Sequence, residues 1–156
     1  MMVMVDNNFL IGMVDDKNYY RVVLQALERD ELRIGLPTPV LAEFLVRDDN
    51  YERGLFLSKV SGFSQVYNFD FKSAQMSAEI MRDLLARGYF ENKDNNKNRQ
   101  VVKVDIQILG IMLANQIEKL FTTDPEISKI VDLLNLPIEI IDFTKNQEFF
   151  GMTLFQ

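Results

Sequence analysis

The stretch MMVMVDNNFLIG (residues 1–12) opens the chain and decides how the rest of it is interpreted. Five apolar residues end abruptly at Asp6, and two asparagines follow. So short an apolar run with a polar stop is typical of a buried β-strand. A carboxylate at the tip of a buried strand is costly, so Asp6 is either a solvated turn residue or part of a site.

The composition limits the chemistry that the chain can perform. Its length of 156 residues predicts a single globular domain over residues 1–156, of which 142–156 form an aromatic tail. The chain contains neither cysteine nor histidine. The two missing residue types exclude Ser-His and Cys-His nucleophiles and most zinc or copper sites. The net charge of −6 gives no general attraction for nucleic acid, although acids that hold cations contribute to that total.

No stretch of the chain has the length of a membrane-spanning helix, which needs about 18 apolar residues or more. The apolar run before Asp6 is also too short for a secretory signal and follows no positive charge. The absence of cysteine fits a reducing compartment. We therefore expect a soluble, cytoplasmic protein that does not associate with membranes.

Short apolar segments alternate with segments of helical periodicity along the chain. Strands are expected at 1–5, 32–35, 63–69, 119–123 and 137–143, and helices at 16–30, 38–49, 51–60, 70–88, 101–119 and 124–135. Thr38 is expected to cap one helix and Asp70 another, and the Asn-rich segment 91–100 is expected to be a loop. The apolar face of the helix after Asp70 is expected to comprise Phe71, Ala74, Ala78, Met81 and Leu85.

This alternation predicts an α/β fold with a mostly parallel sheet covered on both faces. In such a fold the carboxyl ends of the strands and the starts of the following helices meet at one edge of the sheet. Four acids map to that edge: Asp6, Glu43, Asp105 and Asp124. Each also has an ordinary explanation, as a turn residue, a partner of Arg47, a favourable charge at a helix start, and an N-cap before Pro125, respectively.

The joint placement of the four acids carries more weight than any one of them. Carboxylates gathered at one edge repel one another, which raises a pKa or destabilises the fold unless cations are bound there. Oxygen ligands with a high negative charge suit Mg²⁺ or Mn²⁺, and such ions can activate water for attack on phosphorus. The pattern therefore indicates metal-dependent hydrolysis of a phosphate ester.

The ordered motifs resemble those of the PIN domain nucleases, of which the VapC-type toxins of toxin-antitoxin pairs are a large group. Asp6, Asn7 and Asn8 resemble the family's Asp-Thr-Asn; PTPVLAEFL contains Glu43, KVDIQILGIMLA contains Asp105, and Thr122, Thr123 and Asp124 resemble its Thr-x-Asp. The resemblance covers residues 2 to about 142. Asn7 departs from the pattern, because the family usually has a small hydroxyl residue there.

The resemblance implies a three-layer α/β/α sandwich with a five-stranded sheet of order 3-2-1-4-5, Mg²⁺- or Mn²⁺-dependent cleavage of RNA, and commonly a homodimer. It implies that Asp6, Glu43, Asp105 and Asp124 hold the metal, that Asn8 orients Asp6, and that the Thr122 hydroxyl supports the site. A toxin of this type would have an antitoxin protein as its partner.

Two further groups of residues allow either a functional or an ordinary interpretation. Lys93, Lys97, Arg99 and Lys103 lie close to Asp105 in the sequence and could contact substrate phosphates, or belong to a solvated loop. The aromatic residues of the tail, Phe143, Phe149, Phe150 and Phe155, could cover the core or an edge, or form a partner surface.

The sequence thus favours a metal-dependent endoribonuclease, with a non-catalytic PIN-like interaction module as the alternative. A phosphatase of the haloacid dehalogenase type is disfavoured, because its motif needs a second Asp where this chain has Asn8.

Overall fold

A five-stranded parallel sheet forms the centre of the described structure. The computed structural model describes residues 1–48, 51–91 and 102–145. The strands are β1 (Met2–Val5), β2 (Arg33–Pro37), β3 (Ser64–Tyr67), β4 (Lys119–Phe121) and β5 (Glu139–Ile141). They are ordered β3-β2-β1-β4-β5, and all four pairings are parallel. This confirms the predicted strand order, with β1 at the centre.

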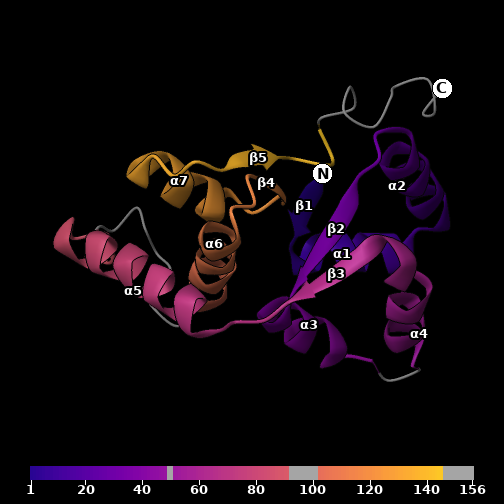
Figure 1. Cartoon of the computed structure of the whole chain (residues 1–156), viewed down its shortest axis with the longest axis horizontal. Coiled ribbons are helices and arrows are strands. Elements are labelled where there is room, and N and C mark those ends of the chain that lie inside the picture. Colours follow the sequence, from indigo (N-terminus) through magenta and orange to yellow (C-terminus); the bar gives the residue numbers. More distant parts are fainter. Residues whose placement is uncertain (49–50, 92–101, 146–156) are drawn as a thin grey trace.

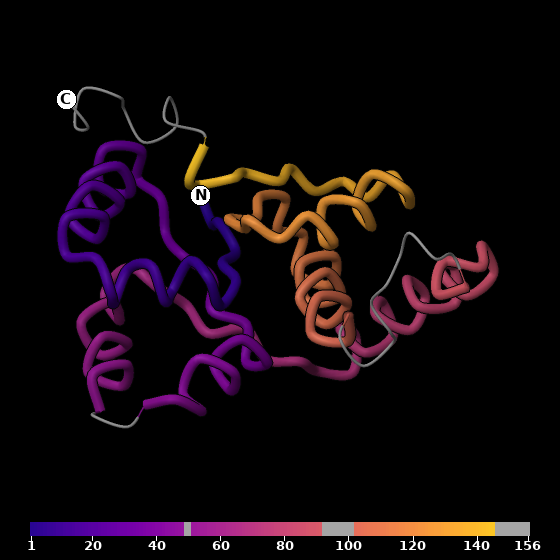
Figure 2. The backbone as a smooth tube through the Cα atoms, turned by 180° about the vertical axis from the view of Figure 1, so that it is seen from behind, coloured from indigo at the N-terminus to yellow at the C-terminus, as the bar shows by residue number. Residues whose placement is uncertain are grey.

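Helices pack around the sheet and complete a three-layer α/β/α fold of the PIN type. They are α1 (Asn7–Asp15), α2 (Lys17–Arg29), α3 (Thr38–Leu45), α4 (Glu52–Lys59), α5 (Phe71–Ala86), α6 (Lys103–Asn115) and α7 (Pro125–Leu134), with a 3₁₀ turn, η1 (Ser61–Phe63). Both backbone views place α5, α6 and α7 together on one side of the molecule, and α1 to α4 on the other (Figures 1 and 2). None of the helices in the described ranges has the length and apolarity needed to cross a bilayer.

Helix α1 was not expected from the sequence. It begins directly after β1, because the Asp6 side chain accepts a hydrogen bond from the Phe9 backbone N–H at 3.0 Å and so caps the helix. Phe9 then stacks on Phe121 of β4 with ring centroids 5.1 Å apart, and the Phe143 ring meets Phe9 edge-on at 5.2 Å. Phe143 is buried, so this member of the aromatic tail belongs to the core. The other tail aromatics, Phe149, Phe150 and Phe155, lie outside the described residues.

The two predicted helix caps have different outcomes. Asp70 does cap α5, accepting a hydrogen bond from the Ser73 backbone N–H at 2.8 Å. The prediction for Thr38 is wrong, because Pro37 occupies the N-cap position of α3. The Thr38 hydroxyl accepts instead from the Phe69 backbone N–H at 3.1 Å, which joins the start of α3 to the chain leaving β3.

The predicted apolar face of α5 is only partly correct: Met81 packs against the core, but most of the face does not. The residues that the helix buries are Ser73, Ser77, Ile80 and Leu84, whereas Phe71 is 78% exposed and Leu85 is 41% exposed. The small buried serines allow α6 to approach closely: the Ser77 hydroxyl donates to the Ile106 carbonyl at 3.1 Å. Close packing of two helices therefore replaces the apolar contact that the sequence pattern favoured.

Gly110 on α6 is where this close packing can be tested. A Cβ atom there would lie 2.7 Å from the Ser73 carbonyl oxygen and 3.0 Å from the Ser77 backbone nitrogen. We expect Gly110→Ala to lower the free energy of unfolding by about 1–3 kcal/mol despite the better helix propensity of alanine, because the overlap must push α5 away from α6. Urea denaturation measures the change. Gly62→Ala is the matched control, since a Cβ there meets no atom within 4 Å; equal stability of the two variants would contradict this packing.

Candidate functional site

The four predicted acids line one pocket at the carboxyl edge of the sheet. Asp6 lies between β1 and α1, Glu43 on α3, Asp105 in the first turn of α6, and Asp124 between β4 and α7. The pocket has a volume of about 200 Å³, and its lining also includes Asn7, Asn8, Val104, Ile108 and Ile127. Four segments that are distant in the sequence thus bring their acids to a single pocket.

Asp6 is the most buried of the four acids, with 6% of its surface exposed. One carboxylate oxygen caps α1, and the other accepts a short hydrogen bond from the Thr122 hydroxyl. Burial raises the pKa of Asp6; the hydrogen bonds from Thr122 and Phe9 lower it, and the nearby charge of Asp124 raises it further, so that the net shift is upward. The fold therefore holds a carboxylate where its charged form is disfavoured.

Asp124 is held from two directions. Its side-chain oxygen Oδ1 accepts from the Glu126 backbone N–H at 2.8 Å, so Asp124 caps α7. Its own backbone N–H donates to the Thr122 hydroxyl oxygen at 3.0 Å. The ordinary explanation of Asp124 as an N-cap is therefore correct, whereas Asp6 is not a solvated turn residue but the buried N-cap of α1, and both residues line the pocket. The two roles are compatible because each carboxylate oxygen carries two lone pairs.

The other two acids, Glu43 and Asp105, differ from each other in their exposure to solvent. Glu43 is exposed, and it forms no ion pair with Arg47 among the described residues. Asp105 is half-buried in the first turn of α6. Within the described ranges, no three acidic side chains stand close enough together to hold a metal ion in their present orientations. The pocket gathers the acids, but coordination requires rotation of at least some of these side chains.

Two asparagines follow Asp6 and share the pocket with it. The side-chain oxygen of Asn7 is buried, with no hydrogen-bond partner in the described structure. Asn8 is exposed, and a hydrogen bond from its backbone helps to lower the pKa of Asp6. The contact to Asp6 therefore comes from the main chain of Asn8. Sequence reasoning gave no role to Asn7, although its position next to Asp6 was a usable signal.

Of the predicted substrate-binding cations, the structure describes Lys103, which is not among the residues that line the pocket. Lys103 is exposed at the start of α6, while Lys93, Lys97 and Arg99 lie outside the described residues. A neighbouring cleft of about 400 Å³ shares Asp124 with the acidic pocket and is also lined by Lys129 and Lys145. The sequence analysis singled out neither lysine. Lys129 lies on α7, which begins directly after the fourth acid, and Lys145 lies after β5.

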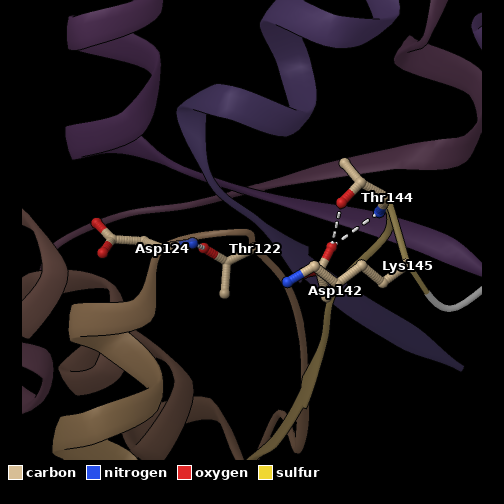
Figure 3. A network of polar contacts seen from close by, with 5 residues as sticks. All are labelled: Thr122, Asp124, Asp142, Thr144 and Lys145. Atoms are coloured by element: carbon tan, nitrogen blue, oxygen red, sulfur yellow. Dashed lines mark hydrogen bonds and ion pairs between the residues drawn. The ribbon is translucent and has the colours of Figure 1, made fainter.

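The far wall of this cleft is formed by a compact polar turn after β5 (Figure 3). Asp142 accepts hydrogen bonds from the Thr144 backbone N–H at 2.9 Å and from its hydroxyl at 2.6 Å, and lies 3.7 Å from the Lys145 ammonium. Although burial raises the pKa of Asp142, the contacts to Thr144 and Lys145 outweigh it and hold that pKa below its usual value. The environment thus favours the charged form of Asp142, whereas it disfavours that of Asp6.

Solved structures include chains with the same fold. No protein-family model and no curated protein sequence matches it. It is similar to a chain in the crystal structure of VapBC2 from Rickettsia felis bound to a DNA fragment from its promoter, with 16% identity, a TM-score of 0.65, and coverage of 90% of this chain and 98% of that one. It is also similar to a chain of DNA-bound VapBC from Salmonella typhimurium, with 18% identity, a TM-score of 0.63, and coverage of 92% and 99%. The PIN-like fold expected from the sequence is confirmed.

The burial of Asp6 makes a prediction about stability in the presence of a chelator. Because the folded-state pKa of Asp6 lies above its ordinary value of 3.8, ionisation of Asp6 destabilises the fold at neutral pH. We expect Asp6→Asn to raise the melting temperature at pH 7, and the gain to decrease on acidification and vanish below pH 3.8, where Asp6 is protonated in both the folded and the unfolded state. Asparagine preserves the cap on α1.

Asp70→Asn is the matched control, since Asp70 is also a helix cap. Hydrogen bonds from Ser73 lower the pKa of Asp70, so its charge stabilises the fold at neutral pH, and this contribution is lost on acidification. The two substitutions should therefore shift the melting temperature in opposite directions at pH 7. Shifts of the same sign would contradict the assigned environment of Asp6.

Proposed function

We propose that this protein is a metal-dependent endoribonuclease. The observation that carries the proposal is the convergence of Asp6, Glu43, Asp105 and Asp124 on one pocket, with Asp6 kept buried beside a second acid. Gathering like charges costs a fold stability, and a bound cation would offset their repulsion. The similarity of the fold to chains of VapBC complexes favours a nuclease of the PIN type over other hydrolases.

The residues in the pocket fit Mg²⁺ or Mn²⁺. All of its donors are oxygens, which these hard ions prefer, and the described pocket offers no softer ligand. The buried side-chain oxygen of Asn7 has no partner within the described structure, and a cation in the pocket would give it one. When bound, the ion supplies an activated water and stabilises the charge of the leaving oxygen.

The chain's own residues would divide the remaining work. Asp6 and Asp124 are fixed by their capping bonds, so they would hold the ion at a defined place relative to β1 and β4. Glu43 and Asp105 would complete the ligand set from α3 and α6. Thr122 holds Asp6 by its hydroxyl, and Asn8 by its backbone. Lys103 at the start of α6, together with Lys97 and Arg99 earlier in the sequence, would contact phosphates of the RNA.

We further propose that the protein is the toxin of a toxin-antitoxin pair. Both solved structures are described as complexes of VapB with VapC-type chains on DNA, which makes an antitoxin protein the expected partner. A gene for such an antitoxin directly upstream would support this assignment.

A homodimer is proposed from the exposed face of α5, which the sequence pattern wrongly assigned to the core. Phe71 and Leu85 lie at its ends, and the exposed Ala78 lies midway between them. An antiparallel pairing of two α5 helices about Ala78 would place Phe71 against Leu85 of the second copy, twice by symmetry. Small residues at the centre would allow the two helices to approach closely.

Metal-dependent cleavage is the direct test of the proposed activity. Purified protein should cut RNA in Mg²⁺ or Mn²⁺ and stop in a chelator, and the ion should raise the melting temperature because it binds the folded state. Asp6→Asn and Asp105→Asn should each reduce cleavage by about 100-fold or more, since each would replace a negatively charged ligand of the ion by a neutral amide. Gel assays on structured RNA, single-stranded RNA and single-stranded DNA measure the rates and identify the substrate.

Asp70→Asn should cleave at the wild-type rate, because Asp70 lies outside the pocket. Cleavage that survives chelation, or that is unchanged in Asp6→Asn, would disprove the mechanism. Metal binding by the wild type without cleavage of any of the three substrates would favour the alternative, a non-catalytic interaction module.

The homodimer can be tested with one substitution. Ala78→Arg would place two like charges together at the proposed symmetry axis, so it should convert the dimer to a monomer without unfolding the chain. Light scattering after size-exclusion chromatography measures the mass. Leu133→Arg on α7, where the leucine is likewise 41% exposed, should leave the dimer intact. A wild-type monomer, or an Ala78→Arg dimer, would rule out this interface.

A further inference from the structure

Tyr89 is buried beside the acidic pocket, although no motif pointed to it. Only 3% of its surface is exposed. It follows Gly88, whose left-handed backbone (φ +64°) ends α5, and its N–H donates to the Leu84 carbonyl at 3.0 Å. The Phe90 ring meets its ring edge-on at 5.3 Å, and the Lys129 ammonium lies 5.8 Å from its centroid. The tyrosine side chain is therefore held firmly between the end of α5 and the side of α7.

The Tyr89 hydroxyl donates a short hydrogen bond to the Glu126 carboxylate. Glu126 lies in the first turn of α7, and its backbone N–H is the group that donates to Asp124 Oδ1 at 2.8 Å. Asp124 is in turn joined through Thr122 to Asp6. A series of hydrogen bonds thus connects Tyr89 to the buried carboxylate of Asp6. It passes through Thr122 and through both the side chains and the backbone N–H groups of Glu126 and Asp124.

We propose that Tyr89 and Glu126 are positioning residues that fix Asp124 for metal binding. This inference rests on the proposed function, because it assigns a support to the same site. By holding the Glu126 carboxylate on the α5 side, the Tyr89 hydroxyl keeps the first turn of α7 in place, and with it the N–H that orients Asp124. It also prevents Glu126 from turning toward the pocket as a competing ligand.

The surroundings of Tyr89 suit a permanent hydrogen-bond donor. Its burial raises the pKa of its phenol, and the nearby charges of Glu126, Asp105 and Asp124 raise it further. The hydroxyl therefore stays protonated throughout the range in which a nuclease operates. If the donor is removed, a half-buried carboxylate loses its partner and must find another, which makes reorientation of Glu126 favourable.

Tyr89→Phe tests the inference, because it removes the donor and keeps the ring against Phe90 and Lys129. We expect its affinity for Mn²⁺ to fall about tenfold, the scale on which loss of a contact supporting a metal ligand acts. Titration calorimetry measures the affinity, and the melting temperature in chelator confirms folding. Cleavage by Tyr89→Phe should recover at high Mn²⁺, whereas cleavage by Asp124→Asn should not. Tyr20→Phe on α2, whose hydroxyl belongs to a different cleft, should bind Mn²⁺ like the wild type.

Glu126→Gln separates a positioning role from direct coordination. The amide oxygen of glutamine still accepts from Tyr89, so this variant should bind Mn²⁺ nearly as well as the wild type. If it loses as much affinity as Asp124→Asn, then Glu126 holds the ion itself and the inference is wrong. If Tyr89→Phe binds Mn²⁺ normally while Asp124→Asn does not, the inference is wrong and the proposed function stands. If the wild type does not bind Mn²⁺ at all, both fail.

Discussion

The site depends on one hydroxyl group, that of Thr122 at the end of β4. It donates to the Asp6 carboxylate and accepts from the Asp124 backbone N–H, so it joins the first and fourth acids of the pocket. β1 and β4 are adjacent parallel strands, with Val5 paired to Phe121, which is why their next residues meet. The position of two acids is therefore a direct consequence of strand register, and any shift between β1 and β4 would separate them.

The sequence was sufficient to predict the sheet and the edge at which the acids gather. Short apolar strands alternating with helices leave few topologies, and in a parallel sheet the residues after the strands must share an edge. Asp6 and Asp124 could be placed by that rule alone. Their hydrogen-bond partners could not, because the Thr122 hydroxyl and the Glu126 N–H reach them at distances and angles that no pattern of residue types specifies.

Two failures of the sequence analysis have physical reasons. Helix α1 was missed because residues 9–14 (FLIGMV) form a nearly continuous apolar run without helical periodicity, although an Asp6 carboxylate that accepts from the Phe9 N–H is an ordinary capping arrangement. The buried face of α5 was assigned to the wrong residues because hydrophobic periodicity assumes that the most apolar side of a helix is buried. Here Ser73 and Ser77 face α6, where Gly110 leaves room for the serines and the helix backbone. Close helix packing favoured small residues over apolar ones.

The capping bonds explain how a cluster of acids can be kept in a stable fold. Asp6 and Asp124 each start a helix, so their carboxylates gain from backbone N–H groups and from the positive end of the helix dipole. This offsets part of their mutual repulsion and of the burial of Asp6. Glu43, which caps nothing and is exposed, bears little of that cost and is able to turn. Two of the four acids of the pocket are thus fixed by the helices that they cap, and at least one, Glu43, has the exposure that lets a side chain reorient.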